Sequence, residues 1–402
     1  MKKSRCNHAV LLLGLSLLTA APVLAQATQE KPMAPRSSAQ MLVRPDAPPL
    51  AVRGPFKVGV KTLKLSDPAR KRDLTLEVWY PAQFASNQLE ATVYSARAGA
   101  LDIKLPGGAL RDAAPLTGKY PLIIVSHGQP GSRYALTYLT EALAARGFVV
   151  AALDHTGSTY ADLTQAAYVS SIVDRPLDVL YALEELPKQI SSADGQNVGL
   201  LGYSYGGYTM LNSAGVGLSK ADLESYCKAS NNEGPCFALP FFDPLEAARG
   251  ASVRPDPRIK AVMVLAPYGA PWLSKSALEA MKVPLFIGGG SADDVAVYAR
   301  DAKTIFGRSG SRPKFLLTLE GAQHNPWVNP PPLETYRNFA EFERWSEPVW
   351  DKQRTGDIVK HFASAFFGAY LQGNEEAGNY LSSKLLGFLP RTTVGVTLEV
   401  GK

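Results

Sequence analysis

The chain of 402 residues contains only three cysteines and five histidines. Cys6 lies in the N-terminal segment, which leaves Cys227 and Cys236 for the rest of the chain. A structural zinc site needs about four ligands, and no histidine lies near this pair, so we expect no metal there. Two cysteines that enclose a short polar stretch are typical of a local disulfide in an oxidising compartment.

A long run of basic residues is also missing. The formal net charge is +6, but Lys2, Lys3 and Arg5 lie in residues 1–25, which contain no acidic residue, so the remainder carries +3. The other basic residues are scattered, and no nucleic-acid-binding motif is present. These observations exclude nucleic acid as a partner.

The chain begins with basic residues and an apolar stretch from Ala9 to Leu24, which is short for a membrane span and is interrupted by Pro22. Small-residue cleavage patterns follow at 23–25 and 25–27. We therefore predict a signal peptide over residues 1–25 and a periplasmic or secreted protein. No stable membrane anchor is expected after cleavage.

The remaining sequence divides into a short leader and one domain. Residues 26–53 are rich in Pro, Ala and Gln without periodicity, which favours a flexible leader. Residues 54–402 are expected to form a catalytic domain, with an insertion at about 216–256 that holds the cysteine pair. Residues 81–119 show no pattern that assigns them to an element.

Apolar strands alternate with amphipathic helices along this domain. The first two strands, 58–65 and 74–80, are joined by a polar turn and predict an antiparallel hairpin. Further strands are predicted at 121–125, 148–153, 197–201, 259–265, 284–288 and 314–319, and helices at 134–146, 171–187 and 358–371. Such βα repeats predict an α/β fold with a mainly parallel, twisted sheet and helices on both faces.

The sequence Gly202-Tyr203-Ser204-Tyr205-Gly206 follows the 197–201 strand directly and precedes a helix-like stretch. This is the context of a Gly-x-Ser-x-Gly nucleophile elbow, in which a strained turn exposes the serine hydroxyl. Glycine is needed two residues on either side, because side chains there would collide with the neighbouring backbone. Ser204 is therefore the candidate nucleophile.

A serine hydroxyl needs a base, and the acid that orients the base should lie between the two in the chain. His324 follows the 314–319 strand and is the candidate base. Asp293 and Asp294 follow the 284–288 strand, and we favour Asp293 as the acid and treat Asp294 as a loop carboxylate.

An oxyanion must be met by backbone amides, for which we expect the N–H groups of Tyr205 and Gln129. His127 is expected to support the turn before Gln129 structurally. Trp272, Tyr205 and Tyr268 are the preferred candidates for substrate contact, although aromatic residues are as often part of the core. Arg175 and Asp178 lie on one predicted helix and are expected to form an ion pair or a solvated face.

Several short motifs occur together, namely Val78-Trp79-Tyr80-Pro81, Ser126-His127-Gly128, Asp154-His155, Arg175-Pro176-Leu177-Asp178 and the elbow itself. Together they resemble the predicted dienelactone hydrolase branch of the α/β-hydrolases, close to the platelet-activating-factor acetylhydrolases. The segment 266–272 with Asp293 is also similar to cutinase-like polyester hydrolases. The resemblance covers about residues 54–330. It implies a cofactor-free serine hydrolase of carboxylic esters, with Ser204, Asp293 and His324 as catalytic triad.

The sequence thus predicts an exported hydrolase that cleaves small-molecule or polymeric esters through an acyl-serine intermediate. The same triad would also serve a peptidase or amidase. A third possibility is a binding protein without catalytic activity on a hydrolase scaffold, which an intact triad in the expected order argues against.

Overall fold

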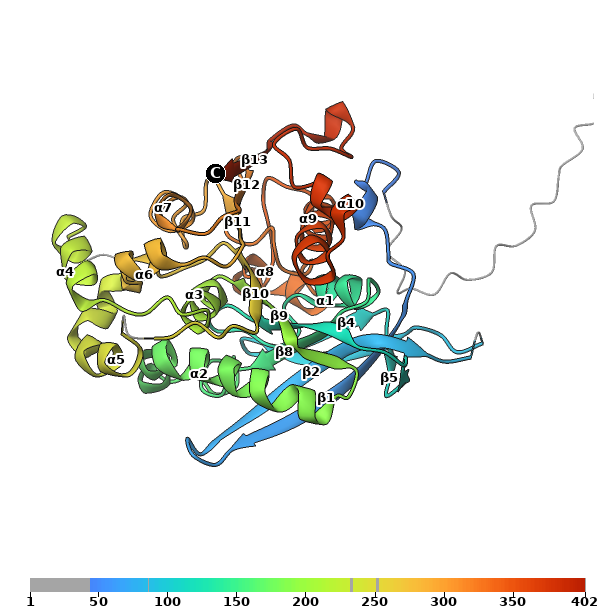
Figure 1. Ribbon diagram of the computed structural model, residues 1–402, viewed down its shortest axis with the longest axis horizontal. Helices are drawn as coiled ribbons and strands as arrows, with labels where there is room; N and C mark the ends of the chain where they lie inside the picture. Colours follow the sequence, from blue (N-terminus) through green and yellow to red (C-terminus); the bar gives the residue numbers. More distant parts are fainter. Residues whose placement is uncertain (1–43, 86, 232–233, 251–252, 402) are drawn as a thin grey trace, which may run out of the picture. The chain divides into compact units, whose positions relative to one another are not determined.

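A mostly parallel sheet lies at the centre of the computed structural model, which describes residues 44–85, 87–231, 234–250 and 253–401 (Figure 1). In spatial order its strands are β13 (Val396–Gly401), β12 (Lys314–Leu319), β11 (Leu285–Gly290), β10 (Ile259–Leu265), β9 (Ala193–Tyr203), β7 (Tyr120–Ser126), β8 (Val149–Asp154), β2 (Arg72–Gln83), β1 (Lys57–Asp67) and β5 (Leu110–Arg111), with β6 (Ala114–Pro115) beside β2. The strands from β8 to β12 are parallel, and β1 and β2 form the predicted antiparallel hairpin. The predicted fold class is confirmed.

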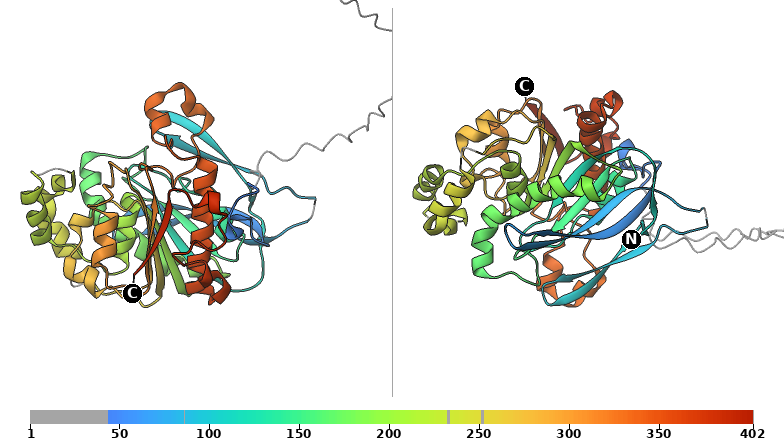
Figure 2. Two further views of the ribbon diagram at one scale, coloured as in Figure 1. Left: turned by 90° about the horizontal axis from the view of Figure 1, so that it is seen from above. Right: turned by 60° about the horizontal axis from the view of Figure 1, so that its bottom comes forward.

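Helices cover both faces of the sheet (Figures 1 and 2). Because successive side chains of a strand point to opposite faces, Ile123 and Val125 of β7 pack in one core while Leu122 and Ile124 pack in the other. The first core contains α1 (Thr137–Ala144) and α9 (Lys352–Gln372), and the second contains α2 (Gln165–Gln189), α3 (Tyr205–Ser213), α6 (Lys275–Ala280) and α7 (Ala302–Arg308). Both cores exclude water from the sheet, as its uniformly apolar strands require.

The unassigned stretch 81–119 contains a second, two-stranded sheet made of β3 (Thr92–Ala98) and β4 (Leu101–Gly107). The short helices η4 (Leu333–Arg337) and α8 (Phe339–Glu343) pack beside it, and the Lys104 N–H donates to Glu334 Oε1 at 3.2 Å. The left view of Figure 2 shows the orange η4–α8 segment next to this cyan hairpin. Segments far apart in the chain therefore build one projecting layer.

The predicted signal peptide and most of the predicted leader lie outside the described residues. The last part of the leader needs correcting, because the short helix η1 (Pro49–Ala51) packs on α9 and Ala51 is buried. The Leu50 N–H donates to His361 Nδ1 at 3.2 Å. Residues 44–53 are thus part of the folded unit, and their Pro-rich composition did not indicate this contact.

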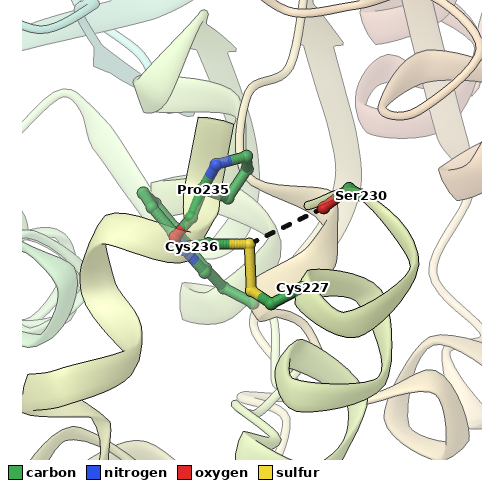
Figure 3. The surroundings of a disulfide bond; sticks show 5 residues. Cys227, Ser230, Pro235 and Cys236 are labelled. Atoms are coloured by element: carbon green, nitrogen blue, oxygen red, sulfur yellow. Dashed lines mark hydrogen bonds between the residues drawn. A yellow bond between two sulfur atoms is a disulfide. The ribbon is translucent and has the colours of Figure 1, made fainter. Parts of the chain in front are cut away.

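The insertion carries α4 (Lys220–Ala229), η2 (Gly234–Phe241) and α5 (Phe242–Arg249). Cys227 of α4 and Cys236 of η2 form a disulfide (Figure 3), which confirms the predicted pairing. The remaining short helices are η3 (Ala270–Trp272), α10 (Glu375–Asn379) and η5 (Pro390–Thr392). Within the described ranges, no helix is both long and apolar enough to cross a bilayer.

Candidate active site

Ser204 occupies the turn between β9 and α3, with φ 56° and ψ −123°, a conformation that is strained for a side-chain-bearing residue. The turn is crowded on both sides. A Cβ at Gly202 would lie 2.1 Å from the carbonyl oxygen of Gly206, and a Cβ at Gly206 would lie 2.1 Å from that of Ser126. Only glycine fits at these two positions, which is the physical requirement of a nucleophile elbow.

The hydroxyl of Ser204 meets a histidine and an aspartate. His324 Nε2 lies 2.9 Å from Ser204 Oγ, and His324 Nδ1 lies 2.8 Å from Asp293 Oδ2. The other carboxylate oxygen of Asp293 accepts from the N–H groups of Val295 at 3.0 Å and Ala296 at 2.9 Å. A carboxylate on Nδ1 holds the proton there and leaves Nε2 free to accept the serine proton.

The structure thus brings together the three predicted residues, and it separates Asp293 from its alternative. Asp293 is 5% exposed and faces His324, whereas Asp294 is exposed and lines the open cleft. Tyr203 packs beside the histidine, with ring centres 5.3 Å apart, and its hydroxyl donates to Asn325 Oδ1 at 2.8 Å. Burial and the Asp293 charge raise the pKa of Tyr203 well above its usual value, so it remains a neutral donor.

Ser204 and His324 open into a cavity of about 830 Å³. Its floor is formed by Gly128, Gln129 and the elbow, and its outer wall comes from residues 339–348 together with Tyr160. Phe339, Ala340, Phe342, Trp345 and Pro348 give the wall its apolar surface, while Glu343, Arg344, Ser346 and Glu347 give it polar and charged groups. The site therefore offers a nucleophile at the bottom of a cleft large enough for a small organic molecule or one end of a polymer.

The two predicted oxyanion donors border the same space. A Cβ at Gly128 would lie 3.3 Å from Ser204 Cβ, so the loop 126–129 lies directly against the nucleophile. Among the described residues, we find no acceptor for the N–H of Gln129 or for that of Tyr205 at the first turn of α3. Free amides beside a nucleophile can bind an oxygen that becomes negative during reaction.

A strained serine turn after the central parallel strand, followed in chain order by Asp293 and His324, decides the fold family. The chain has the α/β-hydrolase fold. Residues 107–170 match the family model described as "Platelet-activating factor acetylhydrolase, isoform II". These residues include β7, the 126–129 loop, α1 and β8. The match supports the acetylhydrolase-like branch of the α/β-hydrolases and, in general terms, an ester hydrolase. No curated protein matches the chain.

Three predicted substrate contacts of this hydrolase are wrong. The side chains of Trp272 and Tyr205 are buried behind the elbow, where Trp272 Nε1 donates to the Pro235 carbonyl at 2.9 Å and the Tyr205 hydroxyl meets Ser171 Oγ at 2.9 Å. The ring of Tyr268 packs 5.5 Å from that of Trp272 and does not line the described cleft. Tyr205 begins α3, which leads from the elbow into the core that contains α2, and Trp272 ends η3, which packs in the same core.

The aromatic residues that do line the cleft of the hydrolase were missed. Tyr160 follows β8, and Phe339, Phe342 and Trp345 lie on and after α8. The closely spaced aromatic residues between 336 and 350 were the available signal in the sequence. They follow the last predicted strand, where nothing in a periodic pattern indicated that the chain returns to the cleft.

Arg175 and Asp178 of the hydrolase were also misjudged, because both are 0% exposed and they do not pair with each other. Arg175 donates to the 126–129 loop, while Asp178 accepts from Arg70 and Arg72 and meets His155 Nδ1 at 3.1 Å.

Within the described ranges, no group of three or more His, Cys, Asp or Glu side chains is placed to hold a metal ion.

Proposed function

We propose that this α/β-hydrolase is an exported serine esterase that cleaves carboxylic esters with Ser204, His324 and Asp293. The observation that carries the proposal is the pair of contacts at His324, 2.9 Å to Ser204 Oγ and 2.8 Å to Asp293 Oδ2, at the bottom of an open cleft. Nucleophile and base within hydrogen-bond reach, with the base oriented by a third group, is the geometry of acyl transfer.

In the proposed reaction, Ser204 Oγ bonds to the ester carbonyl carbon while its proton passes to His324 Nε2. The carbonyl π electrons move to oxygen, and the amides of Gln129 and Tyr205 bind the resulting oxyanion. As the carbonyl reforms, the bond to the alcohol oxygen breaks, and the alcohol leaves with the proton of His324. Water then repeats the sequence on the acyl-serine, which releases the acid and returns the proton to Ser204.

The name of the matched family favours a short acyl group, since it describes an acetylhydrolase. The outer wall of the cleft combines aromatic side chains with Glu343, Arg344 and Glu347, which favours an alcohol part or polymer segment that carries both apolar and polar groups. Esters are favoured over amides because the family match supports an ester hydrolase. p-Nitrophenyl esters of increasing acyl length test the preference for a short acyl group. Comparison with the matching anilides tests the preference for esters over amides.

Export is part of the proposal. The disulfide between Cys227 and Cys236 supports it, because structural disulfides persist mainly in oxidising compartments. The N-terminal sequence of protein recovered from the periplasm or the medium should begin at residue 26 or 28. An intact Met1 on the recovered protein would contradict the export proposal without affecting the chemistry.

The catalytic proposal is tested by Ser204→Ala, with Ser219→Ala, the N-cap of α4, as matched control. Ser204→Ala should lower kcat for p-nitrophenyl acetate by about 10⁴ to 10⁶ while the free energy of unfolding hardly changes. A fluorophosphonate probe should label the wild type and Ser219→Ala at Ser204, and should not label Ser204→Ala. Comparable ester turnover by Ser204→Ala would contradict the proposed function.

A further inference from the structure

Arg175 of α2 is a fully buried cation that serves the loop beside the nucleophile. No carboxylate in the described ranges lies within ion-pair distance of its guanidinium. It donates instead to four acceptors on consecutive residues, which are Ser126 Oγ at 2.8 Å, the His127 carbonyl, the Gly128 carbonyl at 3.3 Å and Gln129 Oε1 at 3.0 Å. A planar group with five fixed donors suits such a curved set of acceptors, and lysine does not.

These contacts fix the direction of a peptide group. The Gly128 carbonyl accepts from Arg175 and also lies 2.6 Å from His127 Nδ1. The His155 N–H donates to His127 Nε2 at 3.3 Å, so the neutral His127 ring carries its proton on Nδ1 and donates it to Gly128. The carbonyl of residue 128 and the N–H of Gln129 belong to one planar trans peptide and point in opposite directions. The Gln129 N–H is thereby turned away from Arg175.

A second set of hydrogen bonds orients Ser126, which is one of the acceptors of Arg175. Ser126 Oγ lies 2.9 Å from His155 Nε2, and His155 Nδ1 lies 3.1 Å from Asp178 Oδ2. Although burial alone would raise it, hydrogen bonds from His155 and Arg72 lower the pKa of Asp178 to about 2, so the carboxylate accepts from His155. Burial and then the charge of Arg175 lower the pKa of His155 to about 4, so its Nε2 is an acceptor. The Ser126 hydroxyl must therefore donate to His155 and can accept from Arg175.

The guanidinium also lies against the helix that begins at the elbow. Its carbon is 4.9 Å from the ring centre of Tyr205, whose hydroxyl bonds to Ser171 on the preceding turn of α2. Burial lowers the pKa of Arg175 to about 10, and the side chain stays charged at neutral pH. One side chain thus contacts both residues whose amides border the nucleophile.

We infer that Arg175 is a positioning residue for the oxyanion site: it holds the Gly128–Gln129 peptide with its N–H toward the cleft and braces Tyr205 beside it. The inference rests on the proposed function, since it assigns a role within that site. Without the arginine, the Gly128 carbonyl loses a charged donor, and the peptide is free to rotate and withdraw its N–H.

Arg175→Lys in the full-length protein tests this inference, with Arg249→Lys as matched control. Arg249 is also buried, and it donates to the side chain and carbonyl of Asn212 at 2.8 Å each, away from the 126–129 loop. Loss of one oxyanion donor typically lowers kcat by roughly 10² to 10³. Arg175→Lys should lose about 10²-fold in kcat for p-nitrophenyl acetate, with KM changed by less than about threefold.

The decisive readout is affinity for a trifluoromethyl ketone, which adds to Ser204 as an oxyanion-bearing hemiketal. For Arg175→Lys this affinity should fall by the same factor as kcat/KM, while affinity for the parent ketone without fluorine is retained. Arg249→Lys should match the wild type in kcat/KM, in affinity for the trifluoromethyl ketone and in affinity for the parent ketone. A kcat/KM within threefold of the wild type, or lost activity with unchanged trifluoromethyl ketone affinity, would overturn the inference.

Circular dichroism checks folding. If Arg175→Lys does not fold, Ser126→Ala takes its place, because it removes one acceptor of Arg175 and the link to His155 but leaves the guanidinium present. Its kcat/KM and its affinity for the trifluoromethyl ketone should both fall by about tenfold. The inference is overturned if the two quantities do not fall together. Failure of the proposed function is a separate result, since it appears as activity in Ser204→Ala.

Discussion

Ser204, His324 and Asp293 lie at an open cleft, whereas Ser126, His155 and Asp178 are joined in the same way inside the fold. The serine–histidine distance is 2.9 Å in both sets, and the histidine–aspartate distance is 2.8 Å in the first and 3.1 Å in the second. Ser204 is 8% exposed, and the three residues of the second set are 0% exposed. We call them the cleft set and the buried set.

The difference lies in what else each serine contacts. Ser204 Oγ meets only His324 among the described residues, so its lone pairs remain free to attack a substrate. Ser126 Oγ is held by both His155 and Arg175, and Asp178 is shared with two further arginines. The comparison teaches that a serine, a histidine and an aspartate in line do not make a nucleophile. The serine also needs space and an unoccupied lone pair.

The largest expected effect distinguishes the acid of the cleft set. Asp293→Asn should lower kcat by roughly 10⁴, because an amide there favours the wrong histidine tautomer. Asp294→Asn is the matched control and should leave kcat within about twofold of the wild type. Ester turnover and fluorophosphonate labelling rates measure both variants. Equal losses in the two variants would show that the geometry at Asp293 does not identify the acid.

Asp178→Asn should act on stability instead. It leaves Arg70 and Arg72 beside a neutral group and should lower the free energy of unfolding by about 3–5 kcal/mol. Asp174→Asn is the control, since Asp174 is partly exposed, contacts Arg72 at 3.4 Å and should cost less than about 1 kcal/mol. Urea unfolding measures both. Similar values for the two variants would place Asp178 outside the stabilising network.

The free energy of unfolding should depend on pH because His155 of the buried set has different pKa values in the folded and unfolded chain. Burial and the charge of Arg175 lower the pKa of folded His155 from 6.5 to about 4, so only the unfolded chain gains this proton between those values. Its contribution is therefore complete above pH 6.5 and is lost as the pH falls toward 4, by up to about 1.4 kcal/mol per pH unit. His127 and His361, whose pKa values burial also lowers, add in the same direction.

His155→Gln should reduce the slope of unfolding free energy between pH 5 and 6.5 by about 1.4 kcal/mol per unit. His361→Gln, outside both sets, should reduce it by a similar amount and calibrates the loss of one buried histidine. Urea unfolding at several pH values measures the slopes. An unchanged slope in His155→Gln would mean that this ring titrates alike in the folded and unfolded chain.

The parts that the sequence predicted well depend on local or repeated patterns. The elbow requires glycines at 202 and 206 for steric reasons that lie within a few residues, and buried parallel strands appear as apolar runs. The order of Ser204, Asp293 and His324 then follows from the fold. The structure brings these three together, while their catalytic role stays a prediction until it is measured.

The parts that were missed depend on contacts between distant segments. Trp272 and Tyr205 were expected at the substrate because they flank the elbow, but α3 directs Tyr205 into the core and η3 places Trp272 in the same core. Arg175 and Asp178 were expected to form an ion pair or a solvated face because they lie on one helix, yet the 126–129 loop binds Arg175 and Arg70 of the β1–β2 turn binds Asp178. Helical spacing identifies neighbours on the helix, and it says nothing about partners supplied by other elements.

The outer wall of the cleft, residues 339–348, belongs to no strand of the central sheet and supplies none of the three residues of the cleft set. The wall nevertheless contacts the loop that carries His324, because the Gln323 N–H donates to Glu347 Oε2 at 3.1 Å and Asn325 Nδ2 donates to the Glu343 carbonyl at 3.0 Å. An engineer who exchanges this wall for a shorter or more polar one therefore has to replace these two hydrogen bonds, so that His324 keeps its position.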